Sequence, residues 1–446
     1  MSSLPQLATA LQQVLQHAPL TVATTSGFCQ RHSKCSAAHF VQTTVLGWAA
    51  RPDATLAELA GVSALGGVAL SPQALDQRLR APASAVVLEA VLAAVTAQLL
   101  PGLPVALELL TRFPAVLLLD STTVVLPDAL ATWWAGCGGS SPVHTQAAVK
   151  LGVRLDLVTG QLDGPCLSAG REQDRASALQ HAPVPPGALR IADRGYWSLA
   201  VLTQICADGG HFLSYLPVQT HLYAAAHPAP LDLLAWLEEH ATGPAGARHC
   251  DAPLLLGKRA QLPVRLLAWE EPDATAARRS HRLHRPARRK RESPPSAHAL
   301  ARTGWTLIVT SLGPDQLSAA EAQALLAARW QLELLFKCWK SCAQLDTWRS
   351  TNPTRIRCEV LAKTIGCVLQ HWLVCTAWAR PDRSYAQALA LLRASVLAVL
   401  LALADHARLL GVLGQLAAAL AHLPGVQARP TRPATFQQLA NPPNVP

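Results

Sequence analysis

The sequence predicts a mixed α/β fold, in which a strand-containing core is flanked by a helical N-terminal domain and a helical C-terminal region. Over residues 1–110, apolar side chains recur at spacings of three and four, as on one face of a helix. From Ala115 the pattern changes to apolar or alternating runs of strand length. The segment from about Ser384 onward is rich in Ala and Leu and again has a helical pattern.

Five domains are expected on this basis: a helical domain, the first part of the core, a β-rich insertion, the completion of the core and a helical C-terminal region. Their expected boundaries are 1–110, 111–217, 218–304, 305–375 and 376–446.

Two short helices are predicted within the N-terminal domain, at 55–60 and 71–80. One interpretation is a helix-turn-helix whose second helix enters a major groove. The side chains that would read DNA are Gln73, Gln77 and Arg78. The segment 61–70 between the helices is long for that motif, so ordinary helix packing is the other interpretation.

The core begins with three runs that predict strands, after which helices and strands alternate. The expected elements are strands at 115–120, 122–126 and 147–157, a helix at 172–180, a strand that ends at Asp193, a helix at 197–207 and a strand at 211–216. This order of elements is that of a ribonuclease-H-like core.

Two aspartates end apolar runs, and a glutamate lies in a segment with a helical pattern. Asp120 and Asp193 each follow a run of strand length, and Glu333 lies within 329–340. Carboxylates are hard oxygen ligands, and a fold that gathers three of them can hold two metal ions for phosphoryl transfer. Taken singly, each aspartate is better explained as a turn or cap residue. Their matching contexts favour the metal interpretation.

A helix over 329–340 would place Glu333 between cations and beside an apolar stripe. Residues that fall within about 60° of one another are Arg329, Glu333, Phe336 and Lys340. The neighbouring apolar stripe consists of Leu325, Ala328, Leu332, Leu335 and Trp339. The alternative is a surface ladder of Arg329, Glu333 and Lys337, whose i, i+4 pairs contribute only a few tenths of a kcal/mol each.

These acidic segments resemble the motifs of the DDE transposases of bacterial insertion sequences, in the insertion sequence four family. The first two motifs are matched by Asp120-Ser121-Thr122-Thr123 and Asp193-Arg194-Gly195-Tyr196. In the third motif the spacing of Arg329, Glu333 and Lys340 is met, but Leu326 stands where the family has a tyrosine. The resemblance covers residues 115–375, and the joint match is far more specific than any one motif.

The resemblance implies a Mg²⁺-dependent enzyme that cleaves and rejoins DNA at the ends of an insertion sequence. The implied catalytic and metal-binding residues are Asp120, Asp193 and Glu333, which would hold two Mg²⁺ ions about 4 Å apart, replaceable by Mn²⁺. The implied DNA contacts within the motifs are Arg194, Tyr196, Arg329, Lys337 and Lys340. In such a core the first and fourth strands are neighbours, which would bring the two aspartates side by side. Ser121, Thr122 and Thr123 are expected to shape the first motif, because the reaction requires no side-chain nucleophile.

The implied partners are double-stranded DNA, as terminal inverted repeats and target DNA, and a second copy of the chain in a paired-end complex. The C-terminal helices are candidate dimerisation elements. Two other functions fit the same residues: a catalytically silent DNA-binding protein derived from a transposase, and a ribonuclease-H-like nuclease that cuts without strand transfer. The three intact acids argue against the silent protein.

The insertion carries a predicted hairpin, at 251–256 and 262–269, and a basic run, Arg278–Arg291. The run is either a solvated, poorly ordered loop or a strip that follows DNA phosphates. Its candidate DNA contacts are Arg285, Arg288, Arg289 and Lys290. The resemblance implies an aromatic residue in this insertion that holds a base turned out of the duplex. Trp236 or Trp269 could do so, although a Trp in an apolar strand is more often part of the core.

Charge and cysteine usage are compatible with a cytoplasmic protein that binds DNA. The net charge of +10 favours a polyanionic partner. The 11 cysteines are odd in number and follow no recognisable export signal, which indicates reduced thiols, and their spacing does not suit zinc. No uninterrupted apolar run approaches the roughly 18–20 residues that a membrane-spanning helix requires, so no membrane partner is expected.

Overall fold

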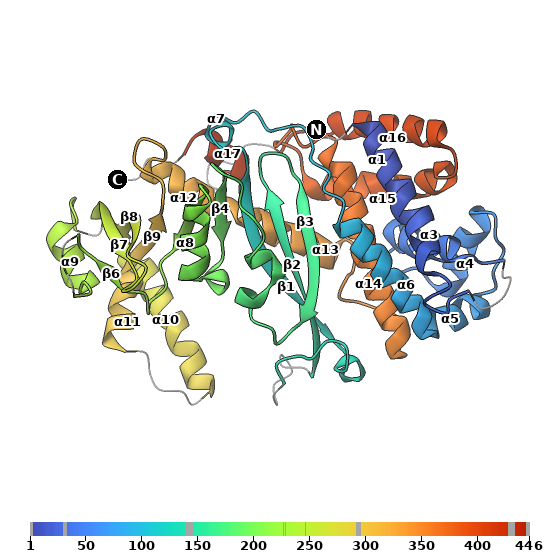
Figure 1. Cartoon of the computed structure of the whole chain (residues 1–446), viewed down its shortest axis with the longest axis horizontal. Coiled ribbons are helices and arrows are strands. Elements are labelled where there is room, and N and C mark those ends of the chain that lie inside the picture. Colours follow the sequence, from blue (N-terminus) through green and yellow to red (C-terminus); the bar gives the residue numbers. More distant parts are fainter. Residues whose placement is uncertain are drawn as a thin grey trace. The chain divides into compact units, whose positions relative to one another are not determined.

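Figure 1 presents the computed structural model of the chain, which describes residues 3–29, 34–138, 146–225, 227, 229–245, 247–290, 296–426 and 433–442. Side chains at 285–290 and 298 are outside this description. The chain forms two compact units. Unit 1 consists of Met1–Thr111, Asp120–Leu179 and Trp330–Phe436, and unit 2 of Arg112–Leu119, Gln180–Arg329 and Gln437–Pro446. The predicted mixed α/β class is confirmed, because the described residues include a nine-stranded sheet and many helices.

Unit 1 is built on helices from both ends of the chain. The N-terminal helices are α1 (Leu4–Gln12), α2 (Ala18–Val22), α3 (Ala37–Ala50), α4 (Leu56–Leu65), α5 (Pro72–Arg80), α6 (Pro82–Thr96) and α7 (Glu108–Thr111). The later helices are α13 (Trp330–Ser341), α14 (Pro353–Cys375), α15 (Tyr385–Ala402) and α16 (His406–Ala421), and α17 (Thr435–Ala440) is divided between the units. α14 packs against α3 and α6 and is buried on all sides, as its apolar sequence requires.

Two described helices, α14 and α15, are long and apolar enough to cross a membrane by length and composition. This corrects the expectation that no segment meets that requirement. The expectation considered uninterrupted apolar runs, whereas a mean over 18 residues tolerates the polar Gln387 and Arg393 of α15. The apolar window of α14 is entirely buried inside the structure, and 39% of the window of α15 is buried. Core packing in unit 1 therefore accounts for the apolar character of α14.

The antiparallel hairpin of β2 (Ala147–Asp156) and β3 (Leu162–Ala169) is anchored to the C-terminal helices of unit 1 by a buried histidine. His371 donates its Nε2 hydrogen to the Gly160 carbonyl over 2.7 Å, so its Nδ1 accepts from the Tyr385 hydroxyl at 3.1 Å. Trp378 donates to the Leu157 carbonyl over 3.1 Å. Gly160 has a φ of +72°, and a Cβ there would lie 2.3 Å from Trp378. The hairpin turn is thus locked against α14 and the turn that follows it.

The core differs from the predicted order of elements in three respects. The runs 115–120 and 122–126 form one strand, β1 (Val116–Leu126), and β3 was not expected. The helix expected at 172–180 is instead two short 3₁₀ turns, Asp174–Ala176 and Ala178–Gln180. Asp174 in the first of these turns accepts hydrogen bonds from the side chains of Ser121 and Lys150, which are distant in sequence.

Unit 2 contains the remaining strands and the insertion. The first half of β1 pairs in parallel with β4 (Leu189–Ala192), and β4 pairs in parallel with β5 (His211–Tyr215). Antiparallel pairing then continues through β9 (Trp305–Thr310), β8 (Leu262–Glu270), β7 (His249–Leu256) and β6 (Leu222–Tyr223). The helices of this unit are α8 (Leu199–Ala207), α9 (Leu233–His240), α10 (Asp273–Lys290), α11 (Ala297–Ala301) and α12 (Ala319–Ala328). The hydrogen-bonded strand order is β3-β2-β1-β4-β5-β9-β8-β7-β6. The strands expected before Asp193 and at 211–216, and the hairpin of the insertion, are confirmed.

Two further segments differ in detail from what the sequence suggested. The helix expected over 329–340 is present as α13, but Leu325 and Ala328 of the predicted stripe lie on α12, which ends at Ala328 with Arg329 as its C-cap. The basic run is not a loop but part of α10, which extends to Lys290, while Arg291 lies outside the described residues. Arginine has a high helix propensity. The negative charge of Asp273 in the first turn also interacts favourably with the positive end of the helix dipole.

Burial lowers the pKa of His371 from its ordinary 6.5 to about 4, because the ring is held neutral among buried groups. The unfolded chain therefore takes up a proton below about pH 6.5 that the folded chain resists until about pH 4. We expect the free energy of unfolding to fall by about 3 kcal/mol over that pH range through this group alone.

Urea denaturation at several pH values would measure this loss as the difference between the wild-type chain and His371→Gln. The variant should have a flatter profile, and His240→Gln, which removes an exposed histidine, should keep the wild-type slope. Parallel profiles for the wild-type chain and His371→Gln would contradict the prediction.

Candidate active site

The first motif lies where β1 passes from buried to accessible surroundings. Val116–Leu119 are buried, and Asp120 and Ser121 are half-buried. The backbone N–H of Ser121 donates to Asp120 Oδ1 over 2.8 Å, which restrains the rotation of the carboxylate. Asp120 therefore presents a carboxylate at a defined position at the edge of an apolar strand.

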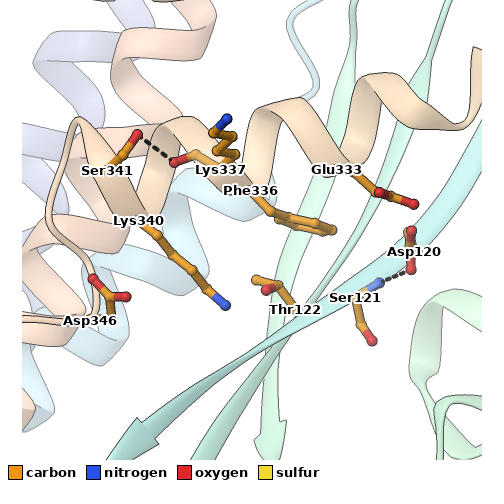
Figure 2. A pocket seen from close by; sticks show the side chains of 9 residues that line it. All are labelled: Asp120, Ser121, Thr122, Glu333, Phe336, Lys337, Lys340, Ser341 and Asp346. Atoms are coloured by element: carbon orange, nitrogen blue, oxygen red, sulfur yellow. Dashed lines mark hydrogen bonds between the residues drawn. The ribbon is translucent and has the colours of Figure 1, made fainter.

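α13 faces β1 within unit 1, and the two elements enclose an open pocket of about 520 Å³. The pocket is lined by Asp120, Ser121, Thr122, Glu333, Phe336, Lys337, Lys340, Ser341 and Asp346. Figure 2 shows Glu333 and Lys340 extending from α13 toward β1. The structure therefore brings two of the three predicted acids, Lys340 of the third motif and the neighbouring Lys337 to one pocket.

The amphipathic character of α13 explains this orientation. Leu332, Leu335 and Trp339 of the predicted apolar stripe are buried, which confirms the stripe. Phe336 is buried as well and lies edge-on to Trp339, with ring centroids 5.9 Å apart. Because this side of the helix is held in the core, Glu333 on the adjacent side must face the pocket.

Lys340 is the most constrained cation of the pocket. Its ammonium donates to the Thr123 carbonyl of β1 over 2.9 Å. Burial lowers the pKa of Lys340 below its ordinary value, and the negative charge of Asp346 opposes that shift. Lys337, by contrast, is exposed.

The second motif lies in unit 2, at the end of β4. Asp193 Oδ1 is 3.8 Å from the Arg329 guanidinium, so the second and third motifs meet in an ion pair. Arg194 is exposed, with its guanidinium 5.3 Å from the ring centroid of Tyr215. Tyr196 is only 1% exposed, so the expectation that its side chain contacts DNA is wrong for this structure. The ring is a core residue, because the 3₁₀ turn after Asp193 directs it inward.

The donor chemistry of the three acids fits a hard divalent cation, since carboxylate oxygens are the ligands that Mg²⁺ and Mn²⁺ prefer. Among the described residues, however, no group of three or more His, Cys, Asp or Glu side chains is gathered closely enough to hold an ion. The pocket of unit 1 contributes Asp120 and Glu333, and Asp193 is paired with Arg329 in unit 2.

The other residues expected to contact DNA lie on α5 and α10. Arg78 is engaged inside unit 1, where its guanidinium lies 4.7 Å from the Phe28 ring centroid and donates to the Phe28 carbonyl, so it is not presented for base reading. Gln73 and Gln77 on α5 are exposed. The side chains of Arg285, Arg288, Arg289 and Lys290 lie outside the described part of α10.

The two tryptophans that were candidates for holding a base are both engaged with other parts of the protein. Trp269 is 7% exposed in β8 and belongs to the core of the insertion. Trp236 is partly buried and stacks on His240, with ring centroids 4.4 Å apart.

Sequence reasoning missed two groups that shape the pocket. Asp346 lines it from the loop after α13, and no helical spacing connects that residue with the third motif. Lys363 on α14 holds the same loop, because its ammonium donates to the carbonyls of Gln344 and Thr347 over 3.1 and 2.8 Å. Glu359 pairs with Lys363 at 2.8 Å, and both are buried. The only sequence signal was an i, i+4 Glu–Lys pair inside an otherwise apolar helix.

The structure thus combines an α/β scaffold with a pocket that carries both acidic and basic side chains. The model of a protein family described as the transposase DDE domain matches residues 111–369, more than half of the chain, including all three motifs. The chain belongs to this family. The resemblance of its motifs to those of insertion-sequence transposases is thereby confirmed.

Several transposases are similar to the chain. The transposase for insertion sequence element IS231F of Bacillus thuringiensis subsp. israelensis is 25% identical over 326 residues, which cover 69% of this chain and 66% of that protein. The transposase for IS231E of Bacillus thuringiensis subsp. finitimus is 24% identical, over 58% of this chain and 56% of that protein. The transposase for IS1151 of Clostridium perfringens is 22% identical, over 60% and 58%. The chain thus spans a little over half to two thirds of the length of these relatives.

The Glu359–Lys363 pair provides a test of how the pocket loop is held. We expect Lys363→Met to destabilise the chain by about 3–5 kcal/mol, because it leaves a buried carboxyl and two loop carbonyls without their donor. Burial already raises the pKa of Glu359, and Lys363 opposes that shift. Thermal or urea denaturation would measure the loss.

Glu359→Gln combined with Lys363→Met should recover part of that stability, because no unpaired charge is then buried. The rest should stay lost, because the two loop carbonyls still lack their donor. Lys337→Met, at an exposed lysine, should change stability by less than about 0.5 kcal/mol. A Lys363→Met chain as stable as the wild type would show that the pair does not hold the loop.

Proposed function

We propose that this chain is a DNA transposase that cleaves and rejoins DNA at the ends of an insertion sequence by phosphoryl transfer. The observation that carries the proposal is the pocket of unit 1, where Asp120 and Glu333 line the same space as Lys337 and Lys340. Carboxylates suit divalent cations and lysines suit phosphates, so the pocket combines the two kinds of group that a phosphodiester reaction needs. The similarity to proteins named as transposases of insertion sequences supports the same function.

The catalytic role is assigned to Asp120, Asp193 and Glu333. The parallel β1–β4 ladder ends at the pair of Leu119 and Ala192, and the two aspartates are the next residues of these strands. This register supports their assignment to one reaction. The neighbouring positions of β1 and β4, together with the parallel β4–β5 pair, support a ribonuclease-H-like arrangement of the core, although the helix expected at 172–180 is missing from it.

The three carboxylates would hold two divalent ions, with Mg²⁺ as the expected ion and Mn²⁺ as a substitute. When bound, such ions lower the pKa of an attacking water or 3′-hydroxyl and stabilise the leaving oxygen. Arg329, as a planar fork, and Lys340, as a point charge, would hold the flanking phosphates. Burial disfavours the charge on Lys340, so an anionic phosphate beside it would stabilise that charge.

The substrate would be double-stranded DNA, as terminal inverted repeats and target DNA, bound by a homodimer in a paired-end complex. The net charge of +10 supports a polyanionic partner. Exposed Gln73 and Gln77 of α5 are candidates for reading a groove, exposed Arg194 for a phosphate, and α10 for a strip that follows phosphates. The site of action would be the cytoplasm, at the nucleoid.

Glu333→Gln tests the assignment of the acids. Gln keeps the size of the side chain but removes the charge that an ion requires, so cleavage of the element's end should fall by at least about a hundredfold. Binding to that end should survive, because Glu333 is assigned to metal and not to DNA. Gel-shift and end-labelled cleavage assays on the same preparations would measure both, with circular dichroism as a check on folding.

Asp120→Asn and Asp193→Asn should behave like Glu333→Gln, and pairs of these changes should add little, because the three acids act as one unit. Near-normal cleavage by folded Glu333→Gln would instead favour the surface ladder. A wild-type chain that binds the ends without cutting them would be a silent DNA-binding protein. Cleavage without joining of a pre-cut end to target DNA would indicate a nuclease.

The basic helix α10 provides a second test. Replacing Arg285, Arg288, Arg289 and Arg291 with Ala should weaken binding to all duplexes. Each lost phosphate contact should reduce the magnitude of the log–log salt slope by roughly 0.9. Lys at the same four positions keeps the charge and should largely keep the slope, which makes it the matched control. An Ala variant with the wild-type slope would mean that these residues are merely solvated.

A further inference from the structure

A chain of hydrogen bonds leads away from Asp120 into the β2–β3 region of unit 1. The backbone N–H of Ser121 donates to Asp120 Oδ1 over 2.8 Å, and the Ser121 hydroxyl donates to Asp174 Oδ1, also over 2.8 Å. Ser121 therefore joins two carboxylates, one through its backbone and one through its side chain. Its own position on β1 is tied to the 3₁₀ turn that contains Asp174.

Asp174 is in turn held by a lysine from the neighbouring strand. Lys150 on β2 donates to Asp174 Oδ1 over 2.9 Å and also to the Glu172 carbonyl. The Lys150 and Asp174 side chains are only 15% and 26% exposed. One oxygen of Asp174 thus accepts from β1 and β2 together, and charge-assisted bonds of this kind are stronger than neutral ones.

The charges in this network are balanced in a way that suits a metal-binding neighbour. A lone Asp174 carboxylate two hydrogen bonds from Asp120 would repel it, and a lone Lys150 ammonium there would oppose a cation. Because the two charges pair, the network can orient Asp120 with little net field at the pocket. The orientation matters because a carboxylate held in one rotamer binds a metal ion more tightly than one that changes rotamer freely.

We propose that Asp174 and Lys150, acting through Ser121, are positioning residues that set the orientation of the Asp120 carboxylate for a divalent cation. The inference rests on the proposed function, because it takes Asp120 to be a metal ligand. It assigns neither Asp174 nor Lys150 a contact with the metal or with DNA.

Two double variants with the same charge isolate the hydrogen bond to Ser121. Asp174→Asn with Lys150→Gln keeps a carbonyl oxygen that can accept from the Ser121 hydroxyl, whereas Asp174→Ala with Lys150→Gln removes that acceptor. The matched control is Asp163→Ala with Arg154→Gln. That pair lies on the same hairpin, 2.7 Å apart with 13% and 24% exposure.

Binding of Mn²⁺ would be measured by electron paramagnetic resonance titration of the full chain without DNA, alongside thermal melting. We expect the Asp174→Ala double variant to bind Mn²⁺ at least about tenfold more weakly than the Asp174→Asn double variant, the loss typical of removing a partner of a metal ligand. The control should bind like the wild-type chain, although it melts earlier. In an Asp120→Asn background, the two Asp174 variants should no longer differ, because the effect passes through Asp120.

Equal Mn²⁺ binding by the two Asp174 double variants would overturn the proposal, as would a control that weakens binding equally or a difference that persists with Asp120→Asn. A wild-type chain that binds no Mn²⁺ would overturn both this proposal and the metal assignment. A wild-type chain that binds Mn²⁺ through Asp120 but does not cut DNA would contradict the proposed function and leave the Mn²⁺ comparison valid.

Discussion

The site depends on the point at which β1 stops being buried. Val116–Leu119 are packed on both faces of the sheet, and a carboxylate within that stretch would lose its hydration without an adequate partner. Asp120 follows immediately and is half-buried, with one oxygen held by the Ser121 N–H. The carboxylate is thus fixed by a rigid strand and remains within reach of the pocket.

α13 is held opposite β1 by two independent means. Its apolar stripe is buried, and Lys340 reaches across to the Thr123 carbonyl. The loop that follows is secured by Lys363, which is itself neutralised by Glu359 inside α14. Acidic and basic groups therefore line one pocket, and the Thr123 carbonyl takes up part of the donor capacity of Lys340. Such a pocket can offer carboxylates to a cation while leaving positive charge for phosphates.

Local patterns predicted most strands and helices because burial leaves a direct trace in the sequence. The apolar runs of β1, β4 and β5, the hairpin of the insertion and the stripe of α13 were readable for this reason. The end of α12 at Ala328 was not, because the residues on both sides of Arg329 have a helical pattern. The helix formed by the basic run was not predicted either, because a run of charges indicates a solvated segment but not whether its backbone is helical.

The sequence by itself determined the kinds of groups available: two aspartates at the ends of apolar runs, a glutamate with basic neighbours at helical spacing, and a strongly basic chain. Only the tertiary structure decided that Asp120, Glu333 and Lys340 share a pocket, that Tyr196 is buried, and that Asp346, Lys363 and Asp174 belong to the surroundings of the site. The physical reason is that a periodic pattern reports which side of an element avoids water. Which elements then meet depends on hydrogen bonds and ion pairs between residues far apart in the chain, and these leave no periodic signal.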